Sequence, residues 1–370
     1  MNLRFLVLLA GAMGMIAACQ DLPQEKAYQY IDLSKFSDGI HHWELYSPIR
    51  SRERLDSSDI IGIADNLLAY QNEDGGWPKN IDWLALIDPD SVTGSLSDRY
   101  RSSTYDNRNI FPQIEYLSAV YQQTEDEKYR QAAENGFRYI LATEYPDGGW
   151  RGWDADVITF NDDVMTGIMD LLLDVKQEHP YYDWLDADLR TQLLTAYDRG
   201  VEVILKCQII INGRKTAWCQ QHDFETYEPV QGRAYEHPSV TARESCDIIL
   251  FLMRIANPDS VVRQAIVSSV AWLEDASIEG YRFAKVPIEE RPYHETTIDY
   301  DREFVPDSSA PPVWARYYDL ENGEPFLSLR DGTIVYDLKE ISFDRRVGYD
   351  WYGYWPERVL AAYPDWEASH

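Results

Sequence analysis

The sequence predicts a mainly α-helical fold, a toroid or superhelix of paired α-helices of the (α/α)3 type with a small β-hairpin region near the C-terminus. The first observation is an internal repeat, because LLAYQNEDGGWPKN (67–80) recurs as ILATEYPDGGWRGW (140–153), and ILKCQIIINGRKTAW (204–218) is a weaker third copy. The second observation is an apolar run that follows each copy. Since a helix pair cannot bury its apolar face alone, we expect the pairs to stack around a shared core.

The helices are predicted from the spacing of apolar residues. Ile114, Leu117 and Tyr121 fall on one face of a helix, and Val164 and Ile168 begin a similar apolar stripe in the next unit. In a stacked array, the Gly-Trp loops and the polar residues before each second helix emerge on one rim. We therefore expect a groove lined by equivalent positions of the repeat.

The N-terminal segment has a charged start, an apolar run as far as Ile16 and two alanines before Cys19. It resembles a bacterial lipoprotein signal with Cys19 as the acylated first residue of the mature chain, and ordinary secretion is the alternative. We expect a signal over 1–19, a tether over 20–38 and one domain over 39–370. This places the protein in the periplasm or at the cell surface, with the outer membrane the expected site and the lipid anchor its only contact with a membrane.

Composition excludes some partners. The formal net charge of −29 repels nucleic acid, so nucleic-acid binding is not expected, and an acidic substrate would require a local cluster of cations or bound metal. Cys207, Cys219 and Cys246 remain after Cys19, so at most one disulfide can form among them, and buried thiols are expected. We expect the chain to act as a monomer.

The C-terminal third of the sequence differs from the repeat in its residue pattern. The segment 312–338 carries the turn pairs Asn322-Gly323 and Asp331-Gly332 between β-prone runs, which predicts a small hairpin. Residues 286–312, rich in Pro, Glu and Asp, are predicted to form a long loop that covers the groove or is an insertion. The cluster GYDWYGYWPERVL (348–360) precedes a last short helix.

Acidic and amide side chains recur before the second helix of two units, where TYDN (104–107) aligns with TFND (159–162). One interpretation is a helix start, because Asn and Asp side chains cap helices and suit the positive end of the helix dipole. The other is a cation site, because hard cations prefer several oxygen ligands. The candidate ligands are Asp106, Asn107, Asp162 and Asp163.

Basic residues in the later units offer the local cluster of cations that an acidic substrate would need. Arg233 lies in GRAYEHPS (232–239), and Lys215 lies in the third Trp loop. Arg316 and Arg330 follow further along the chain. Each arginine alone is more typical of a surface salt bridge, but together they suit the binding of carboxylates.

These motifs together resemble the family 10 polysaccharide lyases, the pectate lyases built as a toroid of paired helices. The resemblance runs from about Ala64 to Tyr363 and rests on YQNEDGGWPKN, YDN, YILATEYPDGGW, ITFNDD, ILKCQIIINGRKTAWCQQHD, GRAYEHPS, VWARYYDL, SLRDGTIVYDL and GYDWYGYWP. It implies Ca²⁺-assisted β-elimination of α-1,4-linked polygalacturonate by one catalytic domain, giving 4,5-unsaturated oligogalacturonides. The segment from Trp150 to Asp162 is shorter than the family pattern, and the 286–312 loop is longer, which affects the expected subsites.

Carried over by motif, Arg233 resembles the base that removes the C5 proton. Asp106, Asp162 and Asp163 resemble the Ca²⁺ and substrate positions, and Arg316 and Arg330 resemble the groups that bind substrate carboxylates. A Ca²⁺ ion on the uronate carboxylate would stabilise the enolate-like transition state. Free arginine has a pKa of about 12.5 or more, so we expect neighbouring Lys and Arg charges and exclusion of water to lower the pKa of the base.

Two other functions remain open. An inverting glycoside hydrolase on a helical toroid could use Asp106 and Asp162 as its acid and base. A non-catalytic surface lipoprotein could bind glycans through some of its 12 Trp and 26 Tyr residues, although most aromatic residues in helical repeats pack in the core. His222 and His237 are expected to support the site rather than to act as an acid and base pair.

Overall fold

The computed structural model describes residues 28–46, 53–86, 101–294 and 296–370. The predicted signal over 1–19 and the first part of the predicted tether lie outside the described residues. Within the described residues, no helix is both long and apolar enough to cross a membrane. The longer helices are α1 (Ser37–Tyr46), α2 (Ile60–Ala69), α5 (Phe111–Thr124), α6 (Glu127–Ala142), α7 (Val164–Lys176), α8 (Ala187–Lys206), α9 (Ala242–Met253), α10 (Ser260–Asp275) and α12 (Pro356–Ser369), and α11 (Phe343–Gly348) is short.

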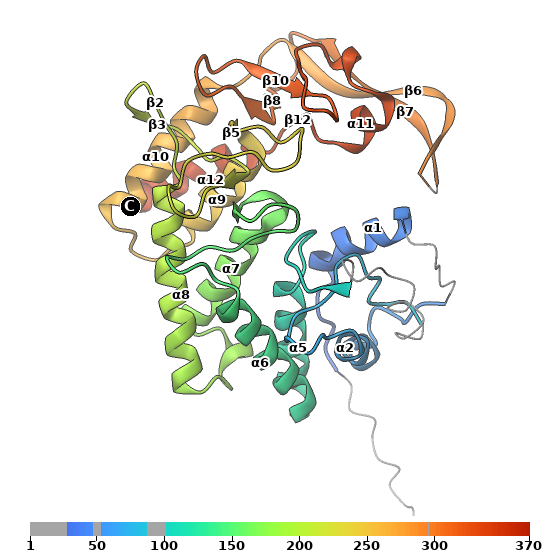
Figure 1. Ribbon diagram of the computed structural model, residues 1–370, viewed down its shortest axis with the longest axis vertical. Coiled ribbons are helices and arrows are strands. Elements are labelled where there is room, and N and C mark those ends of the chain that lie inside the picture. The colour runs from blue at the N-terminus through green and yellow to red at the C-terminus, as the bar shows by residue number, and fades with distance from the viewer. Residues whose placement is uncertain (1–27, 47–52, 87–100, 295) are drawn as a thin grey trace, which may run out of the picture.

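The long helices form an arc of packed pairs that follows the chain (Figure 1). Helix α5 packs on α6, α7 on α8, and α9 on α10, and α12 covers α9 and α10. Their apolar faces join into one core that extends back to Phe36, which contacts Trp83 and Tyr116. Residues 28–36, near the end of the predicted tether, are therefore tied to the helical body.

A buried tryptophan closes each unit of the repeat in the same way. Its indole Nε1 donates a hydrogen bond to a carbonyl in the last turn of the preceding helix. The pairs are Trp77 with Leu67 (2.7 Å), Trp150 with Ile140 (2.9 Å), Trp218 with Ile204 (2.7 Å) and Trp314 with Leu273 (2.7 Å). The fourth pair reveals a further unit, which a long insertion between α10 and Trp314 separates into two parts.

The chain also returns from each Trp loop to the next helix in an equivalent manner. A threonine N–H bonds to the carbonyl of the loop tryptophan before the second helix begins. The pairs are Thr104 with Trp77 (3.3 Å), Thr159 with Trp150 (3.0 Å) and Thr241 with Trp218 (2.8 Å). The residues just after these threonines therefore emerge on one side of the arc, as the repeat predicts.

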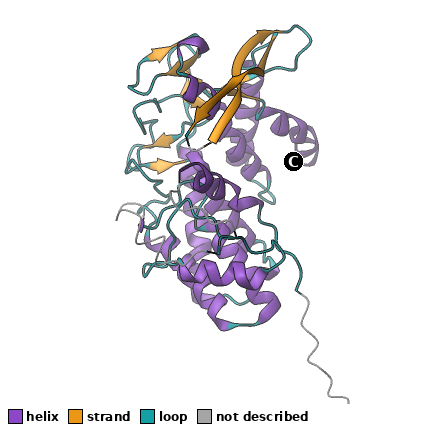
Figure 2. Ribbon diagram, turned by 90° about the vertical axis from the view of Figure 1, so that its right-hand side faces the viewer, coloured by secondary structure: helices purple, strands orange, loops and turns teal. Residues whose placement is uncertain are grey.

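The strands lie mainly in the later part of the chain, beside the helical layer (Figure 2). A four-stranded antiparallel sheet has the order β11-β10-β9-β5, with Leu327 opposite Val335 and Phe326 opposite Tyr317. A long hairpin of β6 and β7 projects from this region, and three further two-stranded pairs are short. The strands are β1 (Ile158–Thr159), β2 (Ile210–Ile211), β3 (Arg214–Lys215), β4 (Gln221–His222), β5 (Val240–Thr241), β6 (Tyr281–Tyr293), β7 (Thr296–Pro306), β8 (Trp314–Ala315), β9 (Tyr317–Tyr318), β10 (Pro325–Ser328), β11 (Ile334–Val335) and β12 (Tyr352–Gly353).

The predicted fold class, a mainly α-helical toroid with a small hairpin region, is wrong. Helix pairs are present, but they form an open arc with a substantial strand-rich part after α10 (Figure 1). The long loop predicted over 286–312 is also wrong, because 13-residue β6 and 11-residue β7 occupy most of it. The chain after α10 pairs with itself as a hairpin, so its backbone groups bond across strands and do not extend the helical layer.

Candidate active site

A cavity of about 770 Å³ lies where the polar starts of the repeat units meet the C-terminal segment. Asn161 and Asp162 enter it from the turn before α7, and Arg233 enters from the loop between β4 and β5. The β6–β7 hairpin and the segment around α11 form further walls. Residues from four parts of the sequence therefore surround one space.

Arg233 is held at this cavity by Glu236, which is almost fully buried. The Arg233 backbone N–H donates to Glu236 Oε2 at 2.9 Å, and Nε donates to Oε1 at 2.8 Å; Nη2 also bonds to Oε1. Burial alone lowers the pKa of Arg233, but the charges of Glu236 and Asp162 outweigh it and raise the pKa above its usual value. The expectation that neighbouring cations lower this pKa is wrong for the groups that the protein itself supplies, because carboxylates are the closest partners.

Asp106 and Asp162 meet beside Arg233, although they come from different repeat units. Their carboxyl groups are hydrogen-bonded to each other, and Lys79 forms an ion pair with Asp106. Burial and the charge of Asp162 raise the pKa of Asp106 to about 7. Burial also favours the neutral form of Asp162, but the charge of Arg233 and the hydrogen bond from Asp106 lower the pKa of Asp162 below its usual value. Below about pH 7 the pair therefore carries one proton, which Asp106 holds in its hydrogen bond to Asp162.

Asn107 and Asp163, which are adjacent to this pair in the sequence, bond to other residues. Asn107 lines the cavity and donates to Asn80 Oδ1 at 2.6 Å. Asp163 forms an ion pair with Arg108 at 2.6 Å and is not among the residues that line the cavity. Asp162 and Asp163 have φ angles of 54° and 56°, in the left-handed region, and Asp163 occupies the N-cap position of α7 without a side-chain capping bond. The helix-capping interpretation is therefore wrong here, and the backbone strain turns the two carboxylates in different directions.

The arginines predicted to bind substrate occupy different environments. Arg316 lines the cavity but is only 3% exposed, and its Nε and Nη2 donate to Glu244, while Nη2 also donates to Asn161 Oδ1 at 2.9 Å. Arg330 lines the same cavity from an exposed position and pairs with Asp344. Arg316 therefore organises the buried polar network, and Arg330 stands at its rim.

Lys215 is not brought to this cavity. It lies in β3, which pairs with β2 as a short hairpin and packs against α10. The sequence placed it correctly in the third Trp loop, but this loop turns toward a helix and not toward Arg233.

Arg345 is a cavity residue that the sequence analysis missed. Its guanidinium carbon lies 4.1 Å from the ring centres of both Tyr235 and Tyr349, and within the described part of the chain its buried Nε and Nη2 have no hydrogen-bond partner. An arginine that lines a cavity and is fixed between two aromatic rings is well placed to bind an anion. The signal in the sequence was the Arg-Arg pair two residues before GYDW (348–351).

Helix α1 and the hairpin tip form another wall that the sequence did not indicate. Tyr46 OH lies 3.5 Å from His294 Nε2, and their rings are 4.8 Å apart. His42 contacts Asp38, and its hydrogen bonds to the side chain and carbonyl of Asp38 outweigh burial and raise the pKa of His42. The cavity is thus bounded on this side by ionisable and aromatic groups.

The remaining predicted groups are structural. His222 is fully buried, its Nε2 accepts from the Cys219 N–H at 3.0 Å, and burial lowers the pKa of His222 to about 4. His237 contacts Ser328 Oγ at 3.1 Å. Cys207, Cys219 and Cys246 are buried free thiols, as the composition predicted.

The described residues of this site would supply only some of the oxygen ligands that a cation requires. Across the described ranges, no three His, Cys, Asp or Glu side chains are grouped to hold a metal ion. The Asp106 and Asp162 carboxylates already compete for one proton, so a divalent cation between them would replace that proton. Since Ca²⁺ takes about six to eight oxygen ligands, substrate carboxylate and water would have to supply most of the others. The pair fits a cation that binds together with an anionic substrate.

Comparisons with known proteins agree with this chemistry. The profile of the family described as pectic acid lyase matches residues 71–360. The family 10 polysaccharide lyase from Cellvibrio cellulosa is 30% identical, with a TM-score of 0.68, and the alignment covers 82% of this chain and 91% of that one. A mutant of that enzyme in complex with trigalacturonic acid has the same TM-score at 29% identity, covering 81% and 90%. Among curated proteins no relative matches. The chain therefore belongs to the pectic acid lyase family and is a family 10 polysaccharide lyase.

Proposed function

We propose that this protein is a pectate lyase that cleaves α-1,4-linked polygalacturonate by Ca²⁺-assisted β-elimination, releasing 4,5-unsaturated oligogalacturonides. The observation that carries the proposal is the cavity that Arg233, Arg345 and Asp162 line together, with Asp106 hydrogen-bonded to Asp162 and lining an adjoining cavity that also contains Arg233. In a chain with a net charge of −29, such a cluster of arginines is the local attraction that an acidic polymer requires.

The roles follow from the contacts. Arg345 binds a uronate carboxylate, because it lines the cavity and its position is fixed by Tyr235 and Tyr349. Arg233 takes the C5 proton from the same sugar. Its backbone N–H, Nε and Nη2 donate hydrogen bonds to Glu236, and these bonds fix the plane of the guanidinium. The C4–O4 bond then breaks, the C4–C5 double bond forms, and O4 of the departing chain takes up a proton from water.

Arg233 must lose a proton before it can act as a base, and the negative charge of Glu236 opposes this loss. When bound at Asp106 and Asp162, Ca²⁺ would supply positive charge that lowers the pKa of Arg233 and neutralises the substrate carboxylate. Asp106 and Asp162 would hold the cation, with Asn107 as a neighbouring oxygen donor. Asp163 is turned toward Arg108 and plays no part in this proposal.

The inverting glycosidase alternative has one attraction, since Asp106 favours a proton and Asp162 favours ionisation. The geometry argues against it. The two carboxyls are hydrogen-bonded to each other, whereas inverting enzymes separate theirs by about 6.5–9.5 Å to admit a water. The other alternative is a protein that binds glycans without cleaving them. Such a protein would not require a shared proton beside an arginine.

The deciding experiment uses protein without residues 1–19 and polygalacturonate, with Ca²⁺ or with a chelator. A lyase produces near-ultraviolet absorbance from the unsaturated uronide, and we expect this signal only with Ca²⁺. New reducing ends without absorbance would indicate a hydrolase, and binding without either product would indicate a glycan-binding protein.

A further inference from the structure

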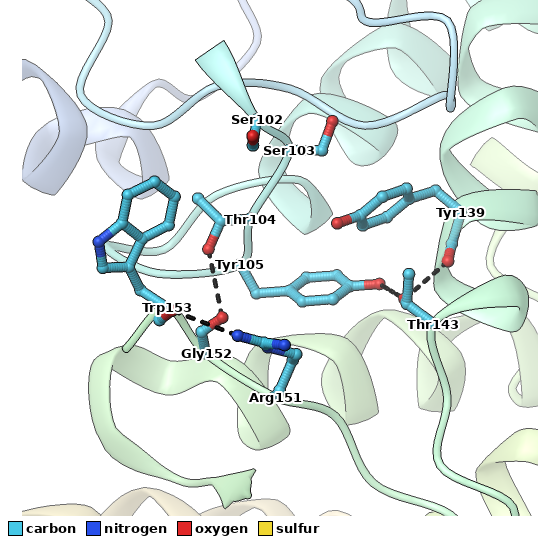
Figure 3. Close-up of a pocket in the computed structure, with 9 residues that line it drawn as sticks. All are labelled: Ser102, Ser103, Thr104, Tyr105, Tyr139, Thr143, Arg151, Gly152 and Trp153. Atoms are coloured by element: carbon cyan, nitrogen blue, oxygen red, sulfur yellow. Dashed lines mark hydrogen bonds between the residues drawn. The ribbon is translucent and has the colours of Figure 1, made fainter. Parts of the chain in front are cut away.

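A second cavity, of about 320 Å³, lies beside the candidate active site and is assigned no role by the proposed mechanism. Figure 3 shows its walls: the rings of Tyr105 and Tyr139 lie on one side, Trp153 lies on the other, and the Arg151 guanidinium reaches in from below. The side chains of Ser103, Thr104 and Thr143 bring hydroxyl groups to the same space. We call it the Trp153 cavity.

The Trp153 cavity adjoins the site, because the two share Trp153 as part of their walls. Trp153 also lines a narrow cavity that contains Asp106 and Arg233. Lys79, the ion-pair partner of Asp106, lies 4.3 Å from the centre of the Trp153 ring. A sugar chain that leaves the Asp106 side of the active site therefore meets Trp153 next.

Charge makes this cavity unusual for the protein. Among its described lining residues, which include no carboxylate, Arg151 is the one charged side chain, in a chain with a net charge of −29. Arg151 contacts Asp156 at 3.5 Å, but both side chains are about half exposed or more, at 48% and 68%. Such exposed pairs are weak, so a carboxylate ligand can replace Asp156 at little cost.

The other lining groups suit the rest of a sugar ring. Trp153 and Tyr139 present aromatic surface, on which a pyranose ring can pack. Thr143 Oγ donates to the Tyr139 carbonyl at 2.8 Å and contacts Tyr105 OH at 2.6 Å, so its position is fixed. The cavity thus combines one cation, aromatic walls and oriented hydroxyls.

We propose that the Trp153 cavity is a distal subsite that binds a further galacturonate unit, with Arg151 on its carboxylate and Trp153 against its ring. This rests on the proposed function, because it assumes a polyuronate substrate in the main cavity. The subsite makes the enzyme favour chains long enough to reach it, since a short oligomer bound at Arg233 leaves Arg151 unused.

The test compares substrates of increasing length. Initial rates with trigalacturonate, longer oligogalacturonates and polygalacturonate are measured for the parent, Arg151→Gln and Trp153→Ala. We expect KM for the longest substrates to rise about tenfold in each variant, with kcat unchanged and KM for the trimer unaffected. Arg138→Gln is the matched control, because Arg138 is an exposed arginine paired with Glu134 on α6 and does not line the cavity.

A binding measurement separates this inference from the proposed reaction. Calorimetric titration of the parent and of Arg151→Gln with a long saturated oligogalacturonate, in the presence of a chelator so that no turnover occurs, reports the subsite without catalysis. Weaker binding of the long oligomer alone supports the subsite, even if no unsaturated product is ever formed. Equal effects on short and long oligomers, or no effect on either, would overturn it. Circular dichroism and a Trp153→Phe variant, expected to retain most of the affinity, show that a loss is not unfolding.

Discussion

Asp106 and Asp162 share one proton through a direct hydrogen bond between their carboxyl groups. They belong to different repeat units, and each follows a threonine that is tied to its own buried tryptophan. The repeat therefore does more than build a core. It brings two acidic groups into contact at the place where a cation is needed.

We expect Ca²⁺ affinity to increase with pH through the region of pH 7. The pKa of Asp106 is raised to about 7 by burial and by the charge of Asp162, so below this pH a proton competes with the cation. Below the pKa of Asp106, the Ca²⁺ affinity should fall by nearly tenfold for each unit of pH. Titration calorimetry at about pH 6 and about pH 8 measures it, and Asp106→Asn should bind weakly without this pH dependence. Equal parental affinity at both values would contradict the shared-proton site.

The same raised pKa predicts how stability changes with pH. Because the folded state binds this proton more tightly than the unfolded chain, the stabilisation is complete at acid pH below the usual pKa of Asp and is lost as pH rises through 7. Added Ca²⁺ should therefore raise the melting temperature more at about pH 8 than at about pH 6. In Asp106→Asn, which has no proton to lose, this difference should disappear; its persistence would assign the effect to other groups.

Arg233→Lys should lower kcat about 10²- to 10⁴-fold while changing KM far less. Lysine keeps a positive charge beside Glu236 but lacks the planar nitrogens that are aimed by the present hydrogen bonds. Rates of unsaturated product formation at saturating Ca²⁺ provide the measurement. Arg214→Lys, at an exposed position in β3, is the control. Near-parental turnover by the Arg233 variant would remove it from the role of base.

Arg345→Ala should raise KM for polygalacturonate about 10- to 100-fold, because a charge-assisted hydrogen bond to a carboxylate is lost. Lys215→Ala should stay within about twofold of the parent, since Lys215 packs near α10 and away from the cavity. Comparing the KM values of the two variants at the same Ca²⁺ concentration decides which of the two basic side chains binds substrate. A larger rise in KM for Lys215→Ala than for Arg345→Ala would restore the substrate-binding role predicted for Lys215.

Gly167→Ala should destabilise the protein by about 1–3 kcal/mol, although alanine is the better helix former. A methyl group at this position in α7 would overlap the ring of Phe111. Gly39→Ala in α1 is the matched control, because its methyl group would make only an ordinary contact of 3.8 Å with the Ile81 carbonyl. Denaturant titration of both variants gives the comparison; similar midpoints would show that α5 and α7 can separate at no cost.

Cys19→Ala should abolish lipidation and release the mature protein from the membrane fraction. The physical reason is that the acyl chains on Cys19 would provide the anchor of a chain that is otherwise strongly acidic. Cys207→Ala, at a buried thiol, is the control for a simple loss of cysteine. Unchanged membrane association of the Cys19 variant would leave ordinary secretion or another attachment.

The hairpin of β6 and β7 shows where local sequence reasoning failed. Pro287 and Pro292 lie within β6, and proline normally argues against a strand. The pairing tolerates them through a register shift between Pro287 and Arg291, and an ion pair from Arg346 to Asp301 holds β7 against α11. The hairpin also separates α10 from Trp314, which is why the fourth unit of the repeat was not recognised.

The sequence by itself determined the family, three of the units of the repeat and the kinds of groups at the site. These depend on local patterns, since the DGGW loops need their glycines: Gly75 and Gly148 have φ angles of 91° and 104°. Only the tertiary structure decided which charged groups meet there. Lys215 and Arg345 both lie near aromatic or repeat motifs, but the first is carried to α10 and the second is fixed between Tyr235 and Tyr349. The reason is that the direction of a loop side chain depends on contacts between segments far apart in the chain, which no short motif encodes.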